Sequence, residues 1–189
     1  MRQLLIALVF VLAMPLAHAA KEVAGIKFED KASVAGNEIA LNGAGVRTRV
    51  VVKVYAMGLY LPEKKGVAAE AISAAGPKRA KIVLLRDLGA QQFVDALNDG
   101  LRKNHSEADL AKLKPQIDEF SQNMLSIKDA PKGATILIDY LPEGGTRLSF
   151  NGQPKGKDIS GEDLYRALLR VWLGDKPADE DLKAGLLGK

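Results

Sequence analysis

Two polar side chains in a valine-rich segment could together bind an anion. Arg47 and Tyr55 lie in the run Val46–Ala56, where valines alternate with polar residues. The two have the same parity, so a single regular strand over this run would present both on one face. A guanidinium is charged at any working pH, and a phenol hydroxyl donates a hydrogen bond. The polar face of this run is therefore either the solvated face of a sheet or the wall of a pocket that binds an anion.

The other residues with useful chemistry exclude several kinds of site. The chain has no cysteine, and His105 is the only histidine beyond residue 19. A thiol nucleophile, a disulfide and a zinc site of the usual kind therefore lack their residues. Gly43-Ala44-Gly45 begins a dinucleotide-binding pattern, but Thr48 stands where the third glycine is required. We predict a turn between strands at these glycines, and we expect neither a cofactor nor a bound metal.

Residues 1–19 have the pattern of a secretory signal peptide. Arg2 precedes the apolar run Leu4–Ala17, and Ala17-His18-Ala19 forms a small-x-small cleavage site. The run is shorter than the roughly 20 apolar residues of a membrane span. We therefore expect export, to the periplasm if the source is Gram-negative, with no stable membrane insertion after cleavage.

The charges of the chain are mixed along its length. It carries 27 basic and 23 acidic residues, a formal net charge of +4. No basic block is strong enough to indicate a nucleic-acid partner. The sequence leaves the oligomeric state open.

Hydrophobic periodicity predicts one α+β domain over residues 20–189. Apolar residues at helical spacing predict helices through Phe93, Leu97 and Leu101, from Leu110 to Met124, and from Leu164 to a stop at Gly174. Two shorter helices are predicted at Val67–Ala75 and Ala178–Leu187. Strands are predicted at Val46–Ala56, Lys81–Leu85, Thr135–Leu141 and Thr146–Phe150. The simplest arrangement is an antiparallel sheet with helices on one face.

Several motifs resemble those of the chalcone isomerase superfamily. They are the turn Asn42–Arg47, the strand Lys53–Leu61, the late hairpin Gly144–Phe150 and the helix Ala167–Gly174. The chain resembles the exported bacterial chalcone isomerase-like proteins more than the plant enzymes. The resemblance implies an open-faced β-sandwich, in which a large antiparallel sheet is covered by a layer of helices, with a ligand cleft between the two layers.

The resemblance also implies candidate roles for single residues. In the superfamily, true isomerases close a chalcone to a flavanone, and related plastid proteins bind fatty acids through a cleft arginine. Arg47 matches that arginine, and Tyr55 matches a strand threonine of the enzymes. Phe93, which has no hydroxyl, matches a later catalytic tyrosine, and Asn98 lies near a catalytic asparagine.

Three hypotheses follow for the function. The first is binding of a small amphipathic acid or phenol, fatty-acid-like or flavonoid-like, by Arg47, Tyr55, Val51, Phe93 and Asn98. The second is an intramolecular lyase of the chalcone isomerase type, with Arg47 and Tyr55 as catalytic residues. The third is a scaffold without a ligand, whose sign would be a cleft filled by the rings of Tyr55, Phe93 and Trp172.

Overall fold

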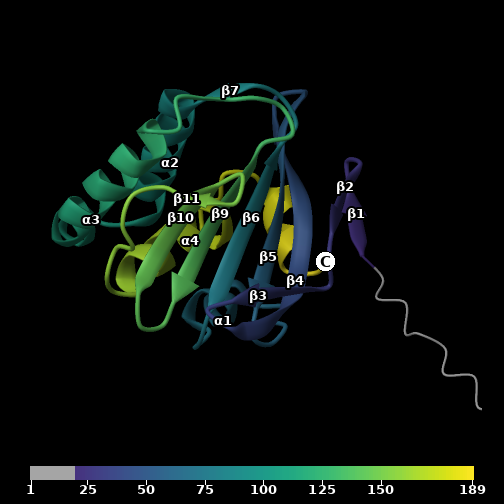
Figure 1. Cartoon of the computed structure of the whole chain (residues 1–189), viewed down its shortest axis with the longest axis horizontal. Coiled ribbons are helices and arrows are strands. Elements are labelled where there is room, and N and C mark those ends of the chain that lie inside the picture. The colour runs from purple at the N-terminus through teal and green to yellow at the C-terminus, as the bar shows by residue number, and fades with distance from the viewer. Residues whose placement is uncertain (1–19) are drawn as a thin grey trace, which may run out of the picture.

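The computed structural model describes residues 20–189, and the predicted signal peptide lies outside the described residues. The described chain is a mixed α+β domain (Figure 1). Its strands are β1 (Lys21–Val23), β2 (Ile26–Phe28), β3 (Lys31–Val34), β4 (Asn37–Arg49), β5 (Val52–Leu61), β6 (Lys78–Leu84), β7 (Leu88–Gly89), β8 (Asp129–Ala130), β9 (Thr135–Leu141), β10 (Gly145–Phe150) and β11 (Gln153–Pro154). Its helices are α1 (Ala68–Ser73), α2 (Ala90–Asn104), α3 (Glu107–Leu125), α4 (Asp163–Leu173) and α5 (Glu180–Leu186).

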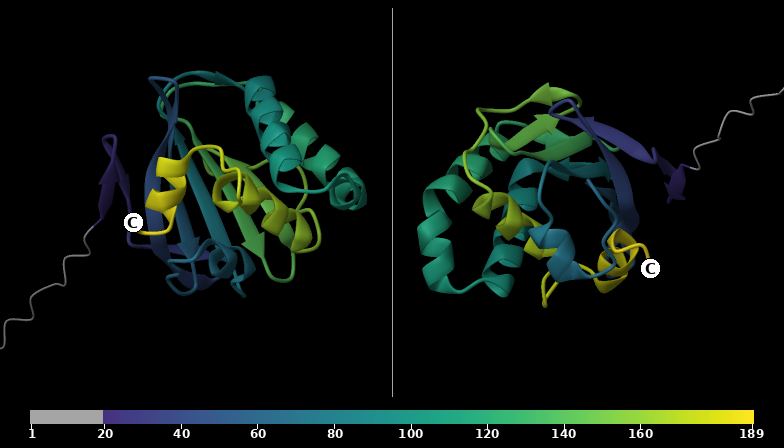
Figure 2. Two further views of the ribbon diagram at one scale, coloured as in Figure 1. Left: turned by 180° about the vertical axis from the view of Figure 1, so that it is seen from behind. Right: turned by 90° about the horizontal axis from the view of Figure 1, so that it is seen from below.

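One curled antiparallel sheet organises the domain. Its seven strands lie in the order β11-β10-β9-β6-β5-β4-β3. The helices lie together on one side of this sheet, as the view from behind shows (Figure 2). The main hydrophobic core fills the space between the two layers. The predicted fold class, a large antiparallel sheet covered by a layer of helices, is confirmed.

The predicted strand Val46–Ala56 is wrong, because the chain turns in its middle. β4 ends at Arg49, β5 begins at Val52, and Val50 and Val51 form the turn between them. Val50 has a φ of +59°, a conformation that favours glycine, asparagine or aspartate. The sequence offers none of these signals, and alternating valines are what an unbroken strand would show. Arg47 and Tyr55 are consequently partners across the hairpin, and partners in register share one face of a sheet.

The glycines at 43 and 45 lie inside β4 rather than in a turn, so that prediction is also wrong. A Cβ on Gly43 would overlap the carbonyl oxygens of Gly185 and Leu186, and a Cβ on Gly45 would crowd Leu182. Their bare backbone lets α5 lie directly on β4. Asn42 fastens this contact by donating a hydrogen bond of 2.6 Å to the carbonyl oxygen of Leu186.

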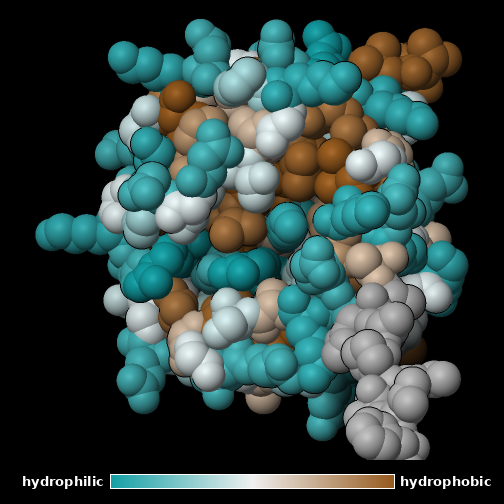
Figure 3. Space-filling view, turned by 45° about the vertical axis from the view of Figure 1, so that its right-hand side comes forward, coloured by the Kyte–Doolittle hydropathy of each residue, from teal (hydrophilic) through white to brown (hydrophobic). Residues whose placement is uncertain are grey.

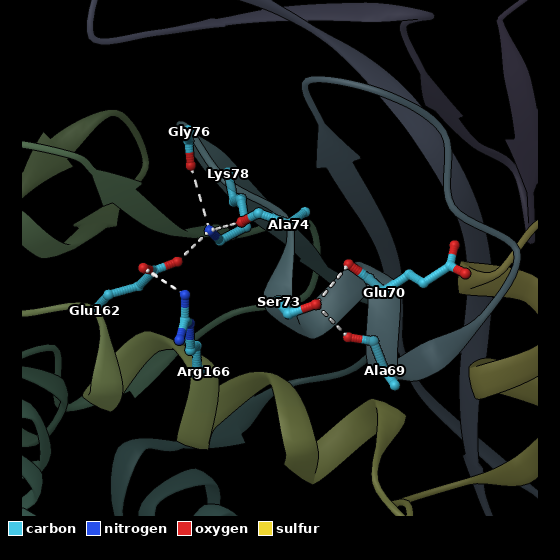
Figure 4. A network of polar contacts seen from close by, with 8 residues as sticks. All are labelled: Ala69, Glu70, Ser73, Ala74, Gly76, Lys78, Glu162 and Arg166. Carbon is cyan, nitrogen blue, oxygen red and sulfur yellow. Dashed lines mark hydrogen bonds and ion pairs between the residues drawn. The ribbon is translucent and has the colours of Figure 1, made fainter.

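A buried lysine joins the sheet to the helix layer at the start of β6. The ammonium of Lys78 donates to the carbonyl oxygens of Ala74 and Gly76 and to the Glu162 carboxylate, the last at 2.7 Å (Figure 4). The second oxygen of Glu162 accepts a hydrogen bond of 2.8 Å from Arg166. Burial lowers the pKa of Lys78, and the hydrogen bond to Glu162 opposes that change. This network fixes the first turn of α4 against the strand.

Replacement of Glu162 by glutamine is expected to destabilise the protein in a pH-dependent way. Burial alone would raise the pKa of Glu162, but the hydrogen bonds and charges of Lys78 and Arg166 outweigh it and lower that pKa. A carboxyl group with a lowered pKa stabilises the fold above its unfolded pKa of about 4.3, and this stabilisation is lost as the pH falls. Urea unfolding of E162Q should show a deficit of about 2 kcal/mol at pH 7, because the lysine keeps its charge without its partner.

The deficit of E162Q should shrink as the pH falls below about 4.3 and should vanish only below the lowered pKa of Glu162 in the folded protein, where the wild-type carboxyl group is itself protonated. Glu143→Gln is the matched control, since Glu143 lies exposed in the β9–β10 turn. An E162Q deficit that is the same at both pH values would contradict the charge-based role of Glu162.

Candidate functional site

A cavity of about 760 Å³ lies between the turn end of the β4–β5 hairpin and the helix layer. Its walls come from the two strands, the segment before β7, helices α2 and α4, and the segment between α4 and α5. Small-molecule sites usually measure about 300–1,000 Å³. The cavity is therefore large enough for an organic ligand, and it lies where the cleft between sheet and helices was predicted.

The deep wall of the cavity is apolar. Phe93 and Leu97 on α2 and Val171 and Trp172 on α4 are buried and line it. The two helices approach closely here, because Gly100 has no side chain and Val171 occupies that space. The rings of Tyr55, Phe93 and Trp172 line this cavity rather than fill it, which argues against the predicted sign of a scaffold.

Tyr55 and Trp172 form a buried hydrogen bond at the cavity wall. The indole N–H of Trp172 donates to the phenol oxygen of Tyr55 at 2.8 Å. Within residues 20–189, no protein group accepts the proton of this phenol, so the hydroxyl has a free donor. Burial raises the pKa of Tyr55 to about 12, although the nearby charge of Arg47 opposes that shift. The phenol is therefore neutral at pH 7 and acts as a hydrogen-bond donor.

Arg47 contributes a positive charge without a carboxylate partner in the described chain. Its half-buried side chain makes one hydrogen bond, of 3.3 Å from Nη1 to the carbonyl oxygen of Ala178. Asp179 follows in the sequence, but its two oxygens accept from the backbone N–H groups of Thr48 and Leu182. A guanidinium has five N–H donors, so most of those of Arg47 remain available to a ligand.

The mouth of the cavity is predominantly basic. Besides Arg47, the cavity lining includes Arg49, Arg86, Lys103 and Lys176, against the two acidic residues Asp95 and Asp99. Asp95 accepts a hydrogen bond from Gln91, and Asp99 is paired with Arg102. The acidic groups are thus partly compensated by neighbours, and the mouth favours an anion.

The structure brings four of the five predicted site residues to this cavity. Arg47, Tyr55 and Phe93 line it near the helix layer, whereas Val51 lies at its rim with 86% of its surface exposed. Val51 does not reach the deep apolar wall, because it occupies the hairpin turn rather than the middle of a strand. Asn98 is half-buried on α2 but is absent from the lining, since it is one residue beyond Leu97 and so points about 100° around the helix.

Trp172 was expected only as a ring that would fill the cleft of a scaffold, and its hydrogen bond to Tyr55 was not predicted. It follows Leu164 and Leu168 at intervals of four residues, a spacing that places all three on one face of α4. Such spacing is typical of residues on one buried face of a helix. It could not show that the ring would meet a tyrosine 117 positions away.

The described residues contain neither a membrane-spanning helix nor a cluster of metal-binding side chains. Within residues 20–189, no helix is long and apolar enough to cross a membrane. The same residues contain no group of three His, Cys, Asp or Glu side chains that could hold a metal ion. The isolated His105 instead contacts the carbonyl oxygen of Leu101 at 3.0 Å, near the end of α2.

Comparison with known proteins agrees with this architecture. A solved structure of a fatty-acid binding protein from Arabidopsis thaliana superimposes with a TM-score of 0.64 at 18% sequence identity, over 86% of this chain and 92% of that one. At such an identity the likeness shows the fold alone. No curated protein sequence matches significantly. The family model described as chalcone isomerase-like matches residues 20–188, and the chain therefore belongs to the chalcone isomerase-like family.

Proposed function

We propose that the cavity binds a small amphipathic molecule with an anionic head group, of the fatty-acid type. The observation that carries this proposal is the pairing of Arg47 and Tyr55 across the hairpin at the edge of an apolar cavity. Both offer hydrogen-bond donors that the described protein groups leave unused. Mostly apolar walls with a few convergent polar groups are the usual form of a small-molecule site.

The charge of Arg47 favours a carboxylate or a phenolate over a neutral head group. Arg47 is permanently charged and can form two parallel hydrogen bonds to a carboxylate. Tyr55 adds a neutral donor because its pKa is raised. The structural likeness to a fatty-acid binding protein supports the carboxylate as the first class to test.

A chalcone-cyclising activity would use the same two residues but would have less support from the cavity. Arg47 would hold the attacking phenolate, and Tyr55 would stabilise the developing enolate. Among the described lining residues Tyr55 carries the only hydroxyl, Phe93 has none, and Asn98 lies outside the lining. We therefore favour binding without turnover.

The proposed binding protein is also proposed to be exported. The support is the pattern of residues 1–19, with a basic start, an apolar run and the Ala17-His18-Ala19 site. Intact-mass measurement of the protein purified from its native host should show a chain that begins at Ala20. A full-length mass would contradict export by cleavage.

Arg47→Gln is expected to weaken binding of dodecanoate by about 10- to 100-fold, since a charge-assisted hydrogen bond contributes roughly 1.5–3 kcal/mol. Binding of 1-dodecanol, which has the same chain length and no charge, should change little. Trp172 is the only tryptophan of the chain and lines the cavity, so its fluorescence reports both titrations.

Arg170→Gln is the matched control for this titration. Arg170 is exposed on α4 and lies outside the cavity lining, so its removal should leave both ligands unaffected. Equal dodecanoate binding by wild-type protein and R47Q would refute the role of Arg47. Ring closure of an added chalcone faster than in buffer, and lost in R47Q, would assign the lyase activity instead.

Tyr55→Phe is expected to destabilise the protein by about 1–3 kcal/mol, because it leaves the buried indole N–H of Trp172 without an acceptor. The double variant Y55F/W172F removes both polar groups, so its cost should be smaller than the sum of the two single costs. Urea unfolding of the four proteins measures this coupling. Simple additivity would show that the hydrogen bond contributes no net stability.

A further inference from the structure

The turn between β4 and β5 exposes three consecutive valines. Val50, Val51 and Val52 have 93%, 86% and 43% of their surface exposed. Apolar side chains project from the corner of the molecule where this turn lies, at the upper right of Figure 3. Valine is among the residues most often buried in folded proteins, so three neighbours in solvent form an unusual apolar tip.

Folding alone does not account for this tip. Val50 adopts a φ of +59°, which is unfavourable for a β-branched residue. Asparagine or glycine would fit the same turn without that strain and without exposing an apolar side chain. Both the positive φ and the exposure to solvent are thus unfavourable for valine. We therefore expect the three side chains to contact something outside the molecule.

Basic side chains surround the tip. Arg49 and Lys53 flank it in the sequence and are exposed, and neither has an acidic partner within residues 20–189. Arg86, Lys103 and Lys176 line the cavity mouth that the same turn borders. An apolar projection with a basic rim is complementary to a bilayer that has anionic head groups.

We propose that the β4–β5 turn docks the protein on an anionic lipid surface and holds the cavity mouth against it. The valines enter the boundary between head groups and acyl chains, and the basic residues contact the phosphates. Docking does not depend on what the cavity binds, and it goes beyond the proposed function. For an amphipathic ligand it would supply a path between bilayer and cavity that avoids bulk water.

A second copy of the chain fits this surface less well. Pairing of two tips would bring Arg49 and Lys53 of both copies together, and these like charges repel. Protein interfaces also concentrate their binding energy in tryptophan, tyrosine and arginine, and valine is under-represented among such residues.

The test is co-sedimentation of ligand-free protein with vesicles of phosphatidylglycerol and phosphatidylcholine. Val50→Asn should lower the partition coefficient and at the same time raise the midpoint of thermal unfolding, because asparagine tolerates a positive φ. The opposite signs separate lost docking from misfolding. Val51→Asp should lower the partition coefficient at least tenfold, because a charged carboxylate replaces the two methyl groups that the valine side chain inserts into the bilayer.

Each of the substitutions to aspartate and to glutamine at the turn has a matched control elsewhere on the surface. Val67, 55% exposed before α1 at the other end of the sheet, should tolerate the same change to aspartate without loss of vesicle binding (Figure 1). Arg49→Gln should weaken partitioning about fivefold, as expected for one basic residue near an anionic surface. Lys157→Gln, the same charge change at an exposed site between β11 and α4, should not.

Three outcomes would overturn the proposal. The first is equal vesicle binding by V51D and wild-type protein. The second is equal binding of wild-type protein to vesicles of phosphatidylcholine alone. The third is a concentration-dependent dimer, detected by light scattering and lost in V51D, which would assign the tip to a second copy. The dodecanoate titration uses no vesicles, so docking and ligand binding can fail independently.

Discussion

A single buried hydrogen bond, from the indole of Trp172 to the phenol of Tyr55, joins sheet and helix layer at the cavity wall. At the other end of β6, Lys78 and Glu162 hold the layers together. The hydrophobic core fills the space between these two contacts, and the cavity lies at the β4–β5 turn end of the domain, beside the Tyr55–Trp172 hydrogen bond. The same hydrogen bond determines how Tyr55 can act. Its phenol oxygen accepts from the indole N–H, so the phenol proton stays free to be donated to a ligand.

Other half-buried arginines of the sheet have carboxylate partners, whereas Arg47 has none in the described chain. On the face of the sheet away from the helices, Arg79 makes a two-pronged contact with Asp139, at 2.7 and 2.6 Å. Arg147 contacts Asp158 in the same way, at 2.8 and 2.6 Å. Buried or half-buried arginines in this fold are thus normally neutralised within the chain. Arg47 is half-buried beside an apolar cavity without such a partner, an arrangement that a ligand anion would complete.

Much of the fold was accessible from the sequence, and the errors have physical causes. The strand Thr135–Leu141 was predicted with the bounds of β9, because its flanking turn residues are conventional. The hairpin through Val50 was missed because its turn uses a residue that ordinarily belongs in a strand. The glycines of β4 were misassigned because their purpose, contact with α5, involves residues about 140 positions later. Tyr55 and Arg47 were nevertheless assigned to one face, since partners across a hairpin also share a face.

The contact between α5 and β4 has a consequence for how the chain reaches its fold. Gly43 and Gly45 touch residues at the extreme C-terminus, and Asn42 binds the carbonyl oxygen of Leu186. Such long-range pairings give a fold a high contact order, which slows folding. Because this contact closes a loop of about 140 residues, which is entropically costly, the packing of α5 on β4 is expected to form late in folding.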